Sequence, residues 1–236
     1  MRHYIPRRYV PGTTTLLLTE ARKMPCASWS LPAREACPYM VTGAGTICGD
    51  PGKHTGCYAD KGSYTQYPGV KRAQRARFAW VRECLKTDEG TDAFVRTMVD
   101  VIRLTRNPYF RVHDSGDLFS PAYVWAWVRI VQALPEVRFW FPTRSWRPLV
   151  MSRMSPAVKM SWQLALMALA AEPNVTVRPS ALFFNAPAPR IPGLQAGSTA
   201  ADDGSFTCPA SLQNNECRDC RACWDQPDVA ISYRAH

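Results

Sequence analysis

Residues 109–141 read YFRVHDSGDLFSPAYVWAWVRIVQALPEVRFWF, and this stretch decides the fold class. It starts with an apolar strand that runs into the polar segment HDSGD at residues 113–117. Ser120 and Pro121 then supply an N-cap and a first helical residue for a helix with regularly spaced apolar positions. A second apolar strand follows over residues 137–141. Strand, helix and strand in this order predict a right-handed βαβ unit with parallel strands.

The same alternation continues on both sides of this unit. After it, we expect a helix from Ser155 and Pro156 to about residue 171, and a third strand over residues 174–179. Before it, residues 28–33 read as a short strand, and apolar positions at helical spacing predict a helix over residues 70–84. A further helix is expected to start after Thr91, as its N-cap, and to reach about residue 106. The chain is therefore predicted to have an α/β fold with a parallel sheet.

Polar residues follow the predicted strands where these end. Functional groups of parallel α/β sheets gather at the carboxyl edge of the sheet. That rule selects seven residues as candidates for a site: His113, Asp114, Ser115, Asp117, Thr143, Arg144 and Ser180. Turn and capping chemistry places the same residue types at strand ends, so a purely local role is the alternative for each of them.

The chain has nine cysteines, and the expected compartment decides how they are interpreted. No apolar core of a signal peptide follows the basic N-terminus, and no apolar run reaches the roughly 18–20 residues that span a bilayer. We therefore expect a cytoplasmic protein with no membrane partner. Clustered cysteines in a reducing compartment bind metal more often than they form disulfides, and the odd count also argues against complete pairing.

Four cysteines near the end of the chain form the more specific motif: Cys208, Cys217, Cys220 and Cys223. Thiolates are soft ligands that select zinc or iron–sulfur clusters over hard cations. Two successive gaps of two residues resemble the arrangement in which ferredoxins hold a cubane cluster. Structural zinc sites more often use two separated Cys-x2-Cys pairs. The motif predicts a [4Fe-4S] cluster, with zinc as the alternative.

A first group, Cys37, Cys48 and Cys57, lies in a Gly/Pro-rich loop over residues 26–62. Three thiolates leave one coordination position open. His54 could fill it and complete a zinc site, or a cluster could keep one iron free for a substrate or cofactor. Cys26 is a candidate outer member of this group. All-structural cysteines are the remaining alternative.

The formal net charge of +10 is unevenly distributed. Residues 1–111 carry 18 Lys and Arg against 9 Asp and Glu, whereas the rest of the chain carries 11 against 10. A basic half favours contact with a polyanion such as nucleic acid, although a solvated basic surface has the same composition.

Several short motifs together resemble a phage protein family named after gene product eighty-eight. They follow one another along nearly the whole chain: Met24-Pro25, residues 28–33, Cys37-Pro38, residues 57–59, Lys61-Gly62, residues 110–117, residues 142–144, Cys208-Pro209 and residues 217–224. That family in turn looks related to phage proteins grouped with the radical S-adenosylmethionine (SAM) enzymes.

This resemblance implies a fold and a set of roles. The fold would be a partial (β/α) barrel of the radical SAM type, with cysteine-rich loops in its N- and C-terminal parts. Cys37, Cys48 and Cys57 would hold a [4Fe-4S] cluster whose open iron chelates SAM, and Ser115, Gly116 and Asp117 would meet the cofactor. The C-terminal cysteines would hold an auxiliary cluster. The cysteine gaps of ten and eight residues, and Asp117 in place of glutamate, depart from the usual pattern of those enzymes.

The preferred hypothesis is a phage-type iron–sulfur protein in the host cytoplasm, with SAM cleavage as the reaction to test first. Asp117 would contact SAM, and Asp114 or Arg144 would position a substrate. Residues 1–186 would form the barrel domain, and residues 187–236 a Pro/Gly-rich tether with the second cysteine site. The rival hypothesis is a non-enzymatic, metal-stabilised protein that binds nucleic acid or regulates. Substrate and oligomeric state are left open.

Overall fold

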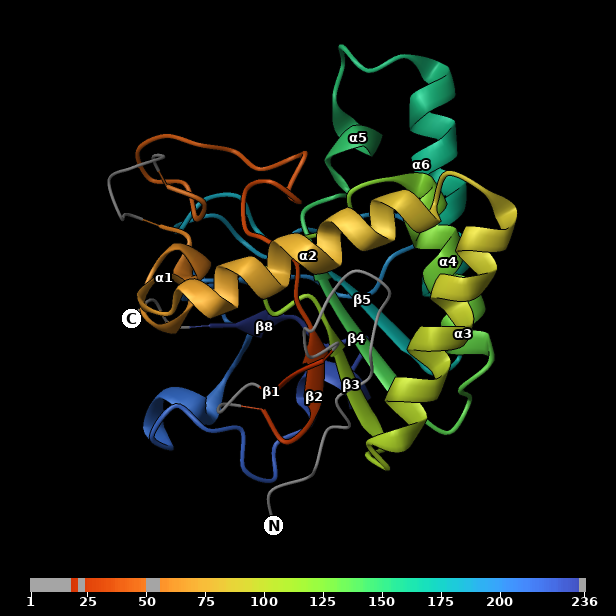
Figure 1. The fold of residues 1–236 in the computed structure, drawn as a ribbon. Helices are drawn as coiled ribbons and strands as arrows, with labels where there is room; N and C mark the ends of the chain where they lie inside the picture. The colour runs from red at the N-terminus through yellow and green to blue at the C-terminus, as the bar shows by residue number, and fades with distance from the viewer. Residues whose placement is uncertain (1–17, 21–23, 50–55, 234–236) are drawn as a thin grey trace.

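A computed structural model of the chain describes residues 18–20, 24–49 and 56–233. Its centre is a five-stranded sheet in the order β1-β2-β3-β4-β5 (Figure 1). The strands are β1 (Thr19–Glu20), β2 (Ala27–Trp29), β3 (Tyr109–Val112), β4 (Arg138–Thr143) and β5 (Val175–Pro179). β1 pairs with β2 in antiparallel fashion, and β2 to β5 are parallel to one another. The predicted α/β class and parallel sheet are confirmed.

Helices follow the parallel strands as crossovers. They are α1 (Ser63–Gln66), α2 (Pro68–Cys84), α3 (Asp88–Leu104), α4 (Pro121–Gln132), α5 (Arg147–Val150) and α6 (Pro156–Ala170). The predicted N-caps Ser120 and Ser155 accept hydrogen bonds from the backbone N–H groups of Tyr123 and Val158. The predicted start after Thr91 was wrong, because the Thr87 side chain caps Gly90 N and α3 begins at Asp88. No helix among the described residues is long and apolar enough to cross a membrane.

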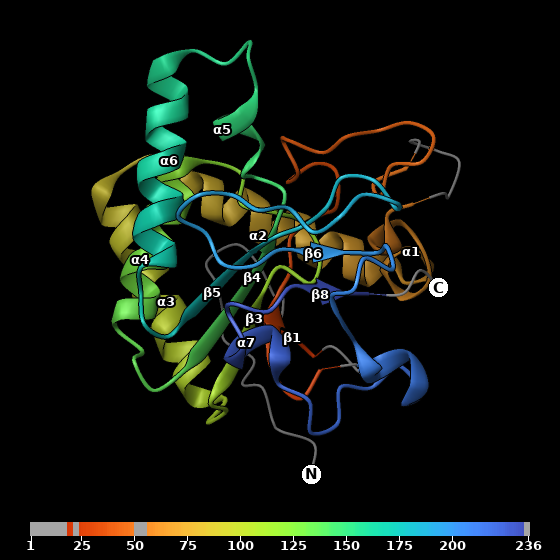
Figure 2. The ribbon, with the colours of Figure 1, turned by 180° about the vertical axis from the view of Figure 1, so that it is seen from behind.

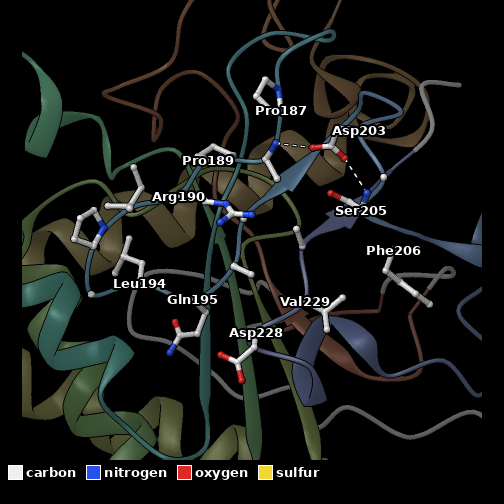
Figure 3. A pocket seen from close by; sticks show the side chains of 18 residues that line it. Pro187, Pro189, Arg190, Leu194, Gln195, Asp203, Ser205, Phe206, Asp228 and Val229 are labelled. Atoms are coloured by element: carbon white, nitrogen blue, oxygen red, sulfur yellow. Dashed lines mark hydrogen bonds between the residues drawn. The ribbon is translucent and has the colours of Figure 1, made fainter.

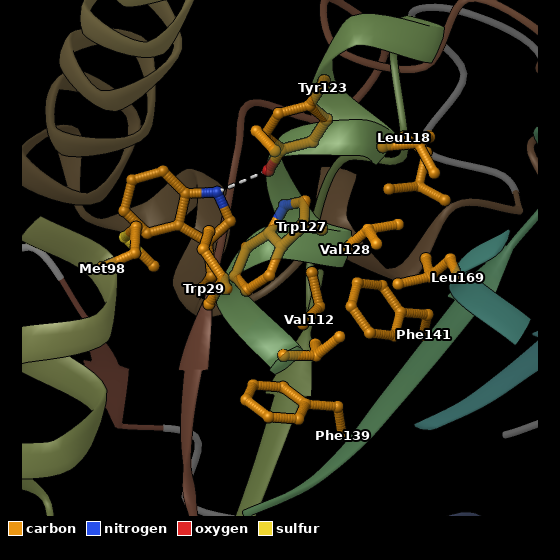
Figure 4. Packing of buried hydrophobic residues seen from close by; sticks show 14 of the residues in the cluster. Trp29, Met98, Val112, Leu118, Tyr123, Trp127, Val128, Phe139, Phe141 and Leu169 are labelled. Carbon is orange, nitrogen blue, oxygen red and sulfur yellow. Dashed lines mark hydrogen bonds between the residues drawn. The ribbon is translucent and has the colours of Figure 1, made fainter. Parts of the chain in front are cut away.

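The main core lies between the sheet and the helices α2, α3, α4 and α6, which pack side by side on one face (Figure 1). Alternate residues of the parallel strands point into it, among them Phe110, Val112, Phe139 and Phe141, each 0% exposed. Large aromatic side chains fill the space (Figure 4), and Trp29 Nε1 donates a hydrogen bond of 2.8 Å to the Tyr123 hydroxyl. This core is what holds the carboxyl ends of β2, β3 and β4 at fixed positions.

The opposite face of the sheet is covered by the C-terminal part of the chain (Figure 2). This part contains β6 (Ser198–Thr199), β7 (Phe206–Thr207) and β8 (Ile231–Ser232), a small parallel sheet in the order β6-β8-β7, and the short helix α7 (Ala222–Asp225). α7 packs on β4 and β5. Trp224 Nε1 donates to the Phe110 carbonyl at 2.9 Å, and Thr176 Oγ1 donates to the Trp224 carbonyl at 2.8 Å. The C-terminal segment therefore lies directly against the sheet.

Arg178 anchors the same segment from β5. Its side chain is 0% exposed, and its two terminal nitrogens donate to the carbonyls of Ala196, Val229, Ala222 and Gln226. A guanidinium with several fixed donors can hold separate loops in one register. The division of the chain at residue 186 stays a prediction.

Candidate functional site

One small pocket collects the residues that the sequence selected in the first cysteine loop and at the strand ends. Its volume is about 50 Å³, and it lies at the carboxyl edge of β3 and β4. Seven predicted site residues line it: Cys37, Cys48, Cys57, Ser115, Gly116, Asp117 and Arg144. These residues come from three separate parts of the chain. Their convergence is the main structural finding about the site.

The cysteine loop is closed by a tight backbone contact between Gly49 and Gly56. A Cβ atom on Gly56 would lie 2.3 Å from the Gly49 nitrogen and 2.8 Å from the Cys48 carbonyl carbon, and the φ angle of Gly56 is +90°. Only glycine accommodates both conditions. The contact brings the neighbouring Cys48 and Cys57 to the same side of the pocket. His54, the predicted additional ligand, lies outside the described residues.

Arg34 ties the cysteine-bearing segments together. It has a left-handed φ of 67° at the turn before Cys37. Its Nη2 donates to the Cys48 carbonyl at 3.1 Å, and its Nε forms an ion pair with Asp60, in the 3-10 turn that directly follows Cys57. One side chain thus contacts the segments of all three cysteines. Its third nitrogen, Nη1, is buried and has no hydrogen-bond partner among the described residues.

The wall formed by the end of β3 depends on Gly116. Leu31 N donates to the Ser115 carbonyl at 2.9 Å, which draws the end of β2 against that of β3. A Cβ atom on Gly116, whose φ is +81°, would lie 2.7 Å from the Leu31 Cβ. The adjacent Ser115 is 3% exposed, and its hydroxyl has no partner among the described residues. An unpaired buried hydroxyl in a pocket wall is suited to bonding a ligand.

Asp117 joins β3 to β4 through hydrogen bonds to both of its carboxylate oxygens. Oδ1 accepts from Leu118 N at 2.7 Å and from Thr143 Oγ1 at 2.5 Å, and Oδ2 accepts from Arg144 N at 2.8 Å. Burial raises the pKa of Asp117, and these hydrogen bonds oppose the rise. The Arg144 guanidinium is itself oriented by Nε, which donates to the Ala181 carbonyl at 3.1 Å. In this structure Asp117 fixes the pocket wall and the backbone of Arg144.

Asp114 and His113 lie behind the pocket rather than in its lining. Tyr64 donates a hydrogen bond of 3.1 Å to Asp114 Oδ2, and Tyr58 donates to the Asp114 carbonyl. Burial raises the pKa of Asp114, against the opposing effect of Arg111. His113 is 2% exposed with Nε2 3.0 Å from the Tyr123 hydroxyl, and burial lowers its pKa to about 3. His113 is therefore a neutral core residue.

Two of the pocket thiols, those of Cys37 and Cys57, are held in their protonated form. Burial raises the pKa of Cys37, and the neighbouring Asp117 carboxylate raises it further. Burial also raises the pKa of Cys57. No disulfide involves any of the nine cysteines. A soft metal ion would have to displace these thiol protons on binding.

The second cysteine group lies on the covered face of the sheet, away from the pocket. Cys223 belongs to a buried cluster with Trp140 and Trp224, and Cys208 and Cys220 pack against it partly buried. Cys217 is 8% exposed. Cys26, which the sequence associated with the first loop, is buried in this second cluster instead. The structure thus separates the cysteines into two groups and moves Cys26 from the first to the second.

Among the residues that the structure describes, no three His, Cys, Asp or Glu side chains form a ready metal-binding group as they stand. A second cavity, of about 910 Å³, is bounded by residues 187–197, 203–206 and 228–230, and no cysteine lines it (Figure 3). Asp203 closes one side of it by accepting hydrogen bonds from Ala188 N and Ser205 N at 3.0 and 3.1 Å. This cavity is distinct from both cysteine groups.

The sequence did not identify Arg34, Met40 and Tyr58 as pocket residues, although all three line it. Tyr58 stands inside the motif over residues 57–59, and Arg34 lies in the same cysteine-rich loop between the motifs over residues 28–33 and 37–38. Arg34 adopts a left-handed backbone conformation at the loop turn. Glycine and asparagine are the usual residues in that conformation, so no sequence pattern indicated an arginine there.

Fold and site together define a mixed α/β protein with four parallel strands, a cysteine-lined pocket at their carboxyl edge and a second cysteine group on one face. The chain belongs to the Gene product 88 family, whose sequence profile matches residues 10–226. The resemblance to that phage family is confirmed.

Two curated relatives match over a short stretch. The Gene 88 protein of Mycobacterium phage L5 is 54% identical over 35 residues, and that of Mycobacterium phage D29 is 51% identical over 35 residues. Each match covers 15% of this chain and 15% of the relative, so the aligned part spans well under two thirds of either phage protein. No solved structure matches the chain.

Proposed function

We propose that this chain is an iron–sulfur protein whose first pocket holds a [4Fe-4S] cluster through Cys37, Cys48 and Cys57. The observation that supports the proposal is the convergence of these three cysteines with Ser115, Gly116, Asp117 and Arg144 on one pocket. Cysteine gaps of ten and eight residues do not bring thiols together by local geometry. Here the Gly49–Gly56 contact and the Arg34 hydrogen bonds perform that task.

The residues fit a soft metal centre by their chemistry. The three thiols are free of disulfides, and each can turn toward the pocket about its single χ1 bond. The Ser115 hydroxyl and Arg34 Nη1 are buried without partners among the described residues, so both are available to bond a ligand. The pocket of about 50 Å³ admits an ion as it stands. A larger group requires the described cysteine-bearing segments of the pocket wall, residues 37–48 and 57–59, to move outward.

Three protein ligands leave one iron of a cubane cluster open, and SAM is the cofactor that the radical SAM resemblance implies for that position. A reduced cluster of this type supplies an electron for cleavage of the SAM sulfonium bond. Arg144 would face the bound molecule with its charge, and the Ser115 hydroxyl would bond it. Asp117 would act as a positioning residue, since all its described hydrogen bonds go to the protein itself. A partial barrel of the radical SAM type is the fold that this proposal implies.

The C-terminal cysteines would hold a second centre, either a [4Fe-4S] cluster or zinc. The four predicted ligands are Cys208, Cys217, Cys220 and Cys223. Cys223 belongs to the buried cluster with Trp140 and Trp224, and Cys208 and Cys220 pack against this cluster partly buried. Such chemistry suits the reducing cytoplasm of a phage host.

The test is quantitation of iron and acid-labile sulfide, with electron paramagnetic resonance, on anaerobically purified protein with and without SAM. We expect up to two clusters, and a changed spectrum when SAM is added. A triple Cys37, Cys48 and Cys57→Ala variant should lose one cluster and the response to SAM. Cys84→Ala is the matched control, because Cys84 lies on α2 outside both groups. Protein that carries zinc and no iron would contradict the proposal.

A second candidate function is nucleic-acid binding by a metal-stabilised, non-enzymatic protein. It is favoured by Lys71 and Arg72, which are exposed on α2 and form no ion pair with a described residue. Other basic residues of this helix are already engaged: Arg75 pairs with Glu35, and Lys86 pairs with Glu83. Salt-sensitive binding of DNA or RNA that Lys71 and Arg72→Ala abolish, without any binding of SAM, would favour this candidate.

A further inference from the structure

The segment before β2 brings two sulfur-containing side chains to the C-terminal cysteines. Cys26 is 6% exposed and lies in the same buried cluster as Cys223, Trp140 and Trp224. Met24 packs against this cluster, and its Sδ lies 3.7 Å from Cys217 Sγ. About 180 residues of chain separate Cys26 from this group, so only the tertiary fold makes it a neighbour.

Both segments are anchored independently to the sheet. Asn107 Nδ2 donates to the Pro25 carbonyl at 2.7 Å, and β2 pairs with β3 through Ser28 and Arg111 directly after Cys26. On the other side, Trp224 Nε1 bonds the Phe110 carbonyl one residue after Cys223. Since both cysteines are fixed to β3 by neighbouring residues, their approach does not depend on a flexible loop.

The packing identifies the close group. Cys26 and Cys223 are members of one buried cluster, and Cys208 and Cys220 pack against it partly buried. Cys217 reaches the same place through its contact with Met24, which also packs against the cluster. The thiol of Cys26 therefore lies among those of the C-terminal motif.

The surroundings of this group are cationic. Arg178 is fully buried beside Cys223 and bonds only backbone carbonyls, with no carboxylate ion pair among the described residues. Arg111 lies near Cys26 with its Cζ 4.8 Å from the centre of the Trp140 ring. Buried charge is stable only where an opposite charge or full hydrogen bonding compensates it. Four thiolates around a divalent metal carry a net charge of about −2, which would supply that compensation.

We propose that Cys26 is a ligand of the C-terminal centre, together with cysteines of the motif Cys208, Cys217, Cys220 and Cys223. The inference rests on the second centre of the proposed function and changes its ligand set. The ligand is a soft metal, zinc or the iron of a cluster. Because its ligands come from both ends of the chain, the metal links the segment before β2 to the C-terminal segment.

The first experiment uses the unaltered full chain, loaded anaerobically either with zinc or with ferrous iron and sulfide. Each cysteine is alkylated with iodoacetamide before and after chelation, and its rate is read by mass spectrometry. We expect chelation to speed labelling of Cys26 at least about tenfold, in parallel with Cys217 and Cys223. Cys84 should keep its rate. Faster labelling of the C-terminal cysteines with no change at Cys26 overturns the inference.

A pair of variants gives a second measurement. Cys26→Ser should lower metal content or affinity at the C-terminal centre at least about tenfold, whereas Cys84→Ser, on α2 outside both groups, should keep both near the wild-type level. Normal metal affinity in Cys26→Ser overturns the proposed role, and an equal loss in Cys84→Ser would show that the effect is not specific to Cys26. Where Cys26→Ser fails to fold, the labelling of the wild-type chain decides. If the proposed function itself is wrong, the result is different, because chelation would then leave the labelling rate of every cysteine in both groups unchanged.

Discussion

The two cysteine groups of this chain differ in what surrounds their sulfur atoms. The first borders a pocket with polar walls, in which Ser115 and Arg34 keep buried donors that no described residue uses. The second is packed among Trp140, Trp224 and Tyr233, with Cys223 Sγ 3.2 Å from the Tyr233 hydroxyl. One group faces a space, and the other faces packed aromatic rings.

Under the proposed function, this difference predicts two kinds of metal centre. A site with free polar donors and a cavity can take and release a small molecule, as catalytic metal sites with an open position do. A site enclosed by aromatic side chains and fully supplied with thiols excludes additional ligands and contributes to folding. We therefore assign reactivity to the pocket and structural support to the C-terminal group. The following predictions test that assignment.

The largest expected effect is on stability, at the C-terminal group. Trp224→Ala removes a side chain that is 3% exposed, its packing on Trp140 with ring centres 5.3 Å apart, and the hydrogen bond to Phe110. Burial of this size predicts a loss of about 3–5 kcal/mol in the free energy of unfolding, measured by denaturant titration. Leu212→Ala, at a side chain 81% exposed in the same part of the chain, should stay within about 0.5 kcal/mol. A Trp224→Ala loss below about 1 kcal/mol would contradict the structural role.

Gly116→Ala tests the first pocket through its backbone. The added methyl group would lie 2.7 Å from Leu31, on a residue with a left-handed backbone conformation. We therefore expect a loss of about 2–3 kcal/mol in the free energy of unfolding. Metal binding should fall in the first pocket and stay unchanged at the C-terminal group. Gly204→Ala is the matched control, because Gly204 has φ +80° with nothing within 4 Å of its Cβ position. It should show only the conformational cost of about 1–2 kcal/mol. Equal losses in both variants would show that the contact with Leu31 has no effect.

Sequence patterns predicted the parts of the fold that depend on local periodicity and capping. The strand before HDSGD, the N-cap at Ser120 and the helix predicted over residues 70–84, which the structure has as Pro68–Cys84, follow from the spacing of apolar residues and one hydroxyl. The start of α3 was predicted four residues late, because Thr87 and Thr91 are both suitable caps and only the hydrogen bond to Gly90 N distinguishes them.

Contacts between distant segments could not be predicted in this way. Cys26 lies near the C-terminal cysteines because β2 pairs with β3, and Trp224 bonds the Phe110 carbonyl of β3. Arg34 organises the pocket through its contacts with Cys48 and Asp60. Neither partner stands at a helical or strand spacing from Arg34 that would have predicted the contact. The candidates at the strand ends were found because parallel strands bring their carboxyl ends together, which is a rule of topology.

Acid should distinguish the two regions through His113, which lies directly behind the pocket wall. Its pKa of about 3 in the folded chain is below the usual value of about 6.5 in an unfolded one. The unfolded chain therefore binds the extra proton first, and the free energy of unfolding falls as pH drops below about 6.5. Between pH 8 and pH 5 the loss from this residue is about 2 kcal/mol.

His113→Asn isolates this contribution, because asparagine tolerates the left-handed φ of 69°. The raised pKa values of Asp114 and Asp117 act in the opposite sense and stabilise the folded chain in acid. They are present in both proteins, so the difference between wild type and variant reports His113. Chemical unfolding at pH 5 and pH 8 should show a smaller pH effect in the variant, and an unchanged effect would refute the assignment.

The smallest expected change in stability carries the most information about the pocket. Ser115→Ala removes a buried hydroxyl with no partner among the described residues, so the free energy of unfolding should change by less than about 0.5 kcal/mol or rise slightly. Ser145→Ala is the matched control, since the equally buried Ser145 hydroxyl donates a hydrogen bond of 2.5 Å to the Leu118 carbonyl. Its loss should cost about 1–2 kcal/mol.

Binding of SAM to the anaerobically reconstituted protein should be affected more by Ser115→Ala than by Ser145→Ala, the reverse of the order expected for stability. If the Ser115 hydroxyl serves a ligand, Ser115→Ala should weaken binding about 5- to 10-fold while leaving stability intact, because one hydrogen bond to the ligand is lost. Ser145→Ala should bind normally once folded, since its hydroxyl faces the protein. A Ser115→Ala protein that is destabilised by more than about 1 kcal/mol, with unchanged binding, would make this hydroxyl part of the scaffold. The first pocket would then resemble the C-terminal group more closely than its polar walls indicate.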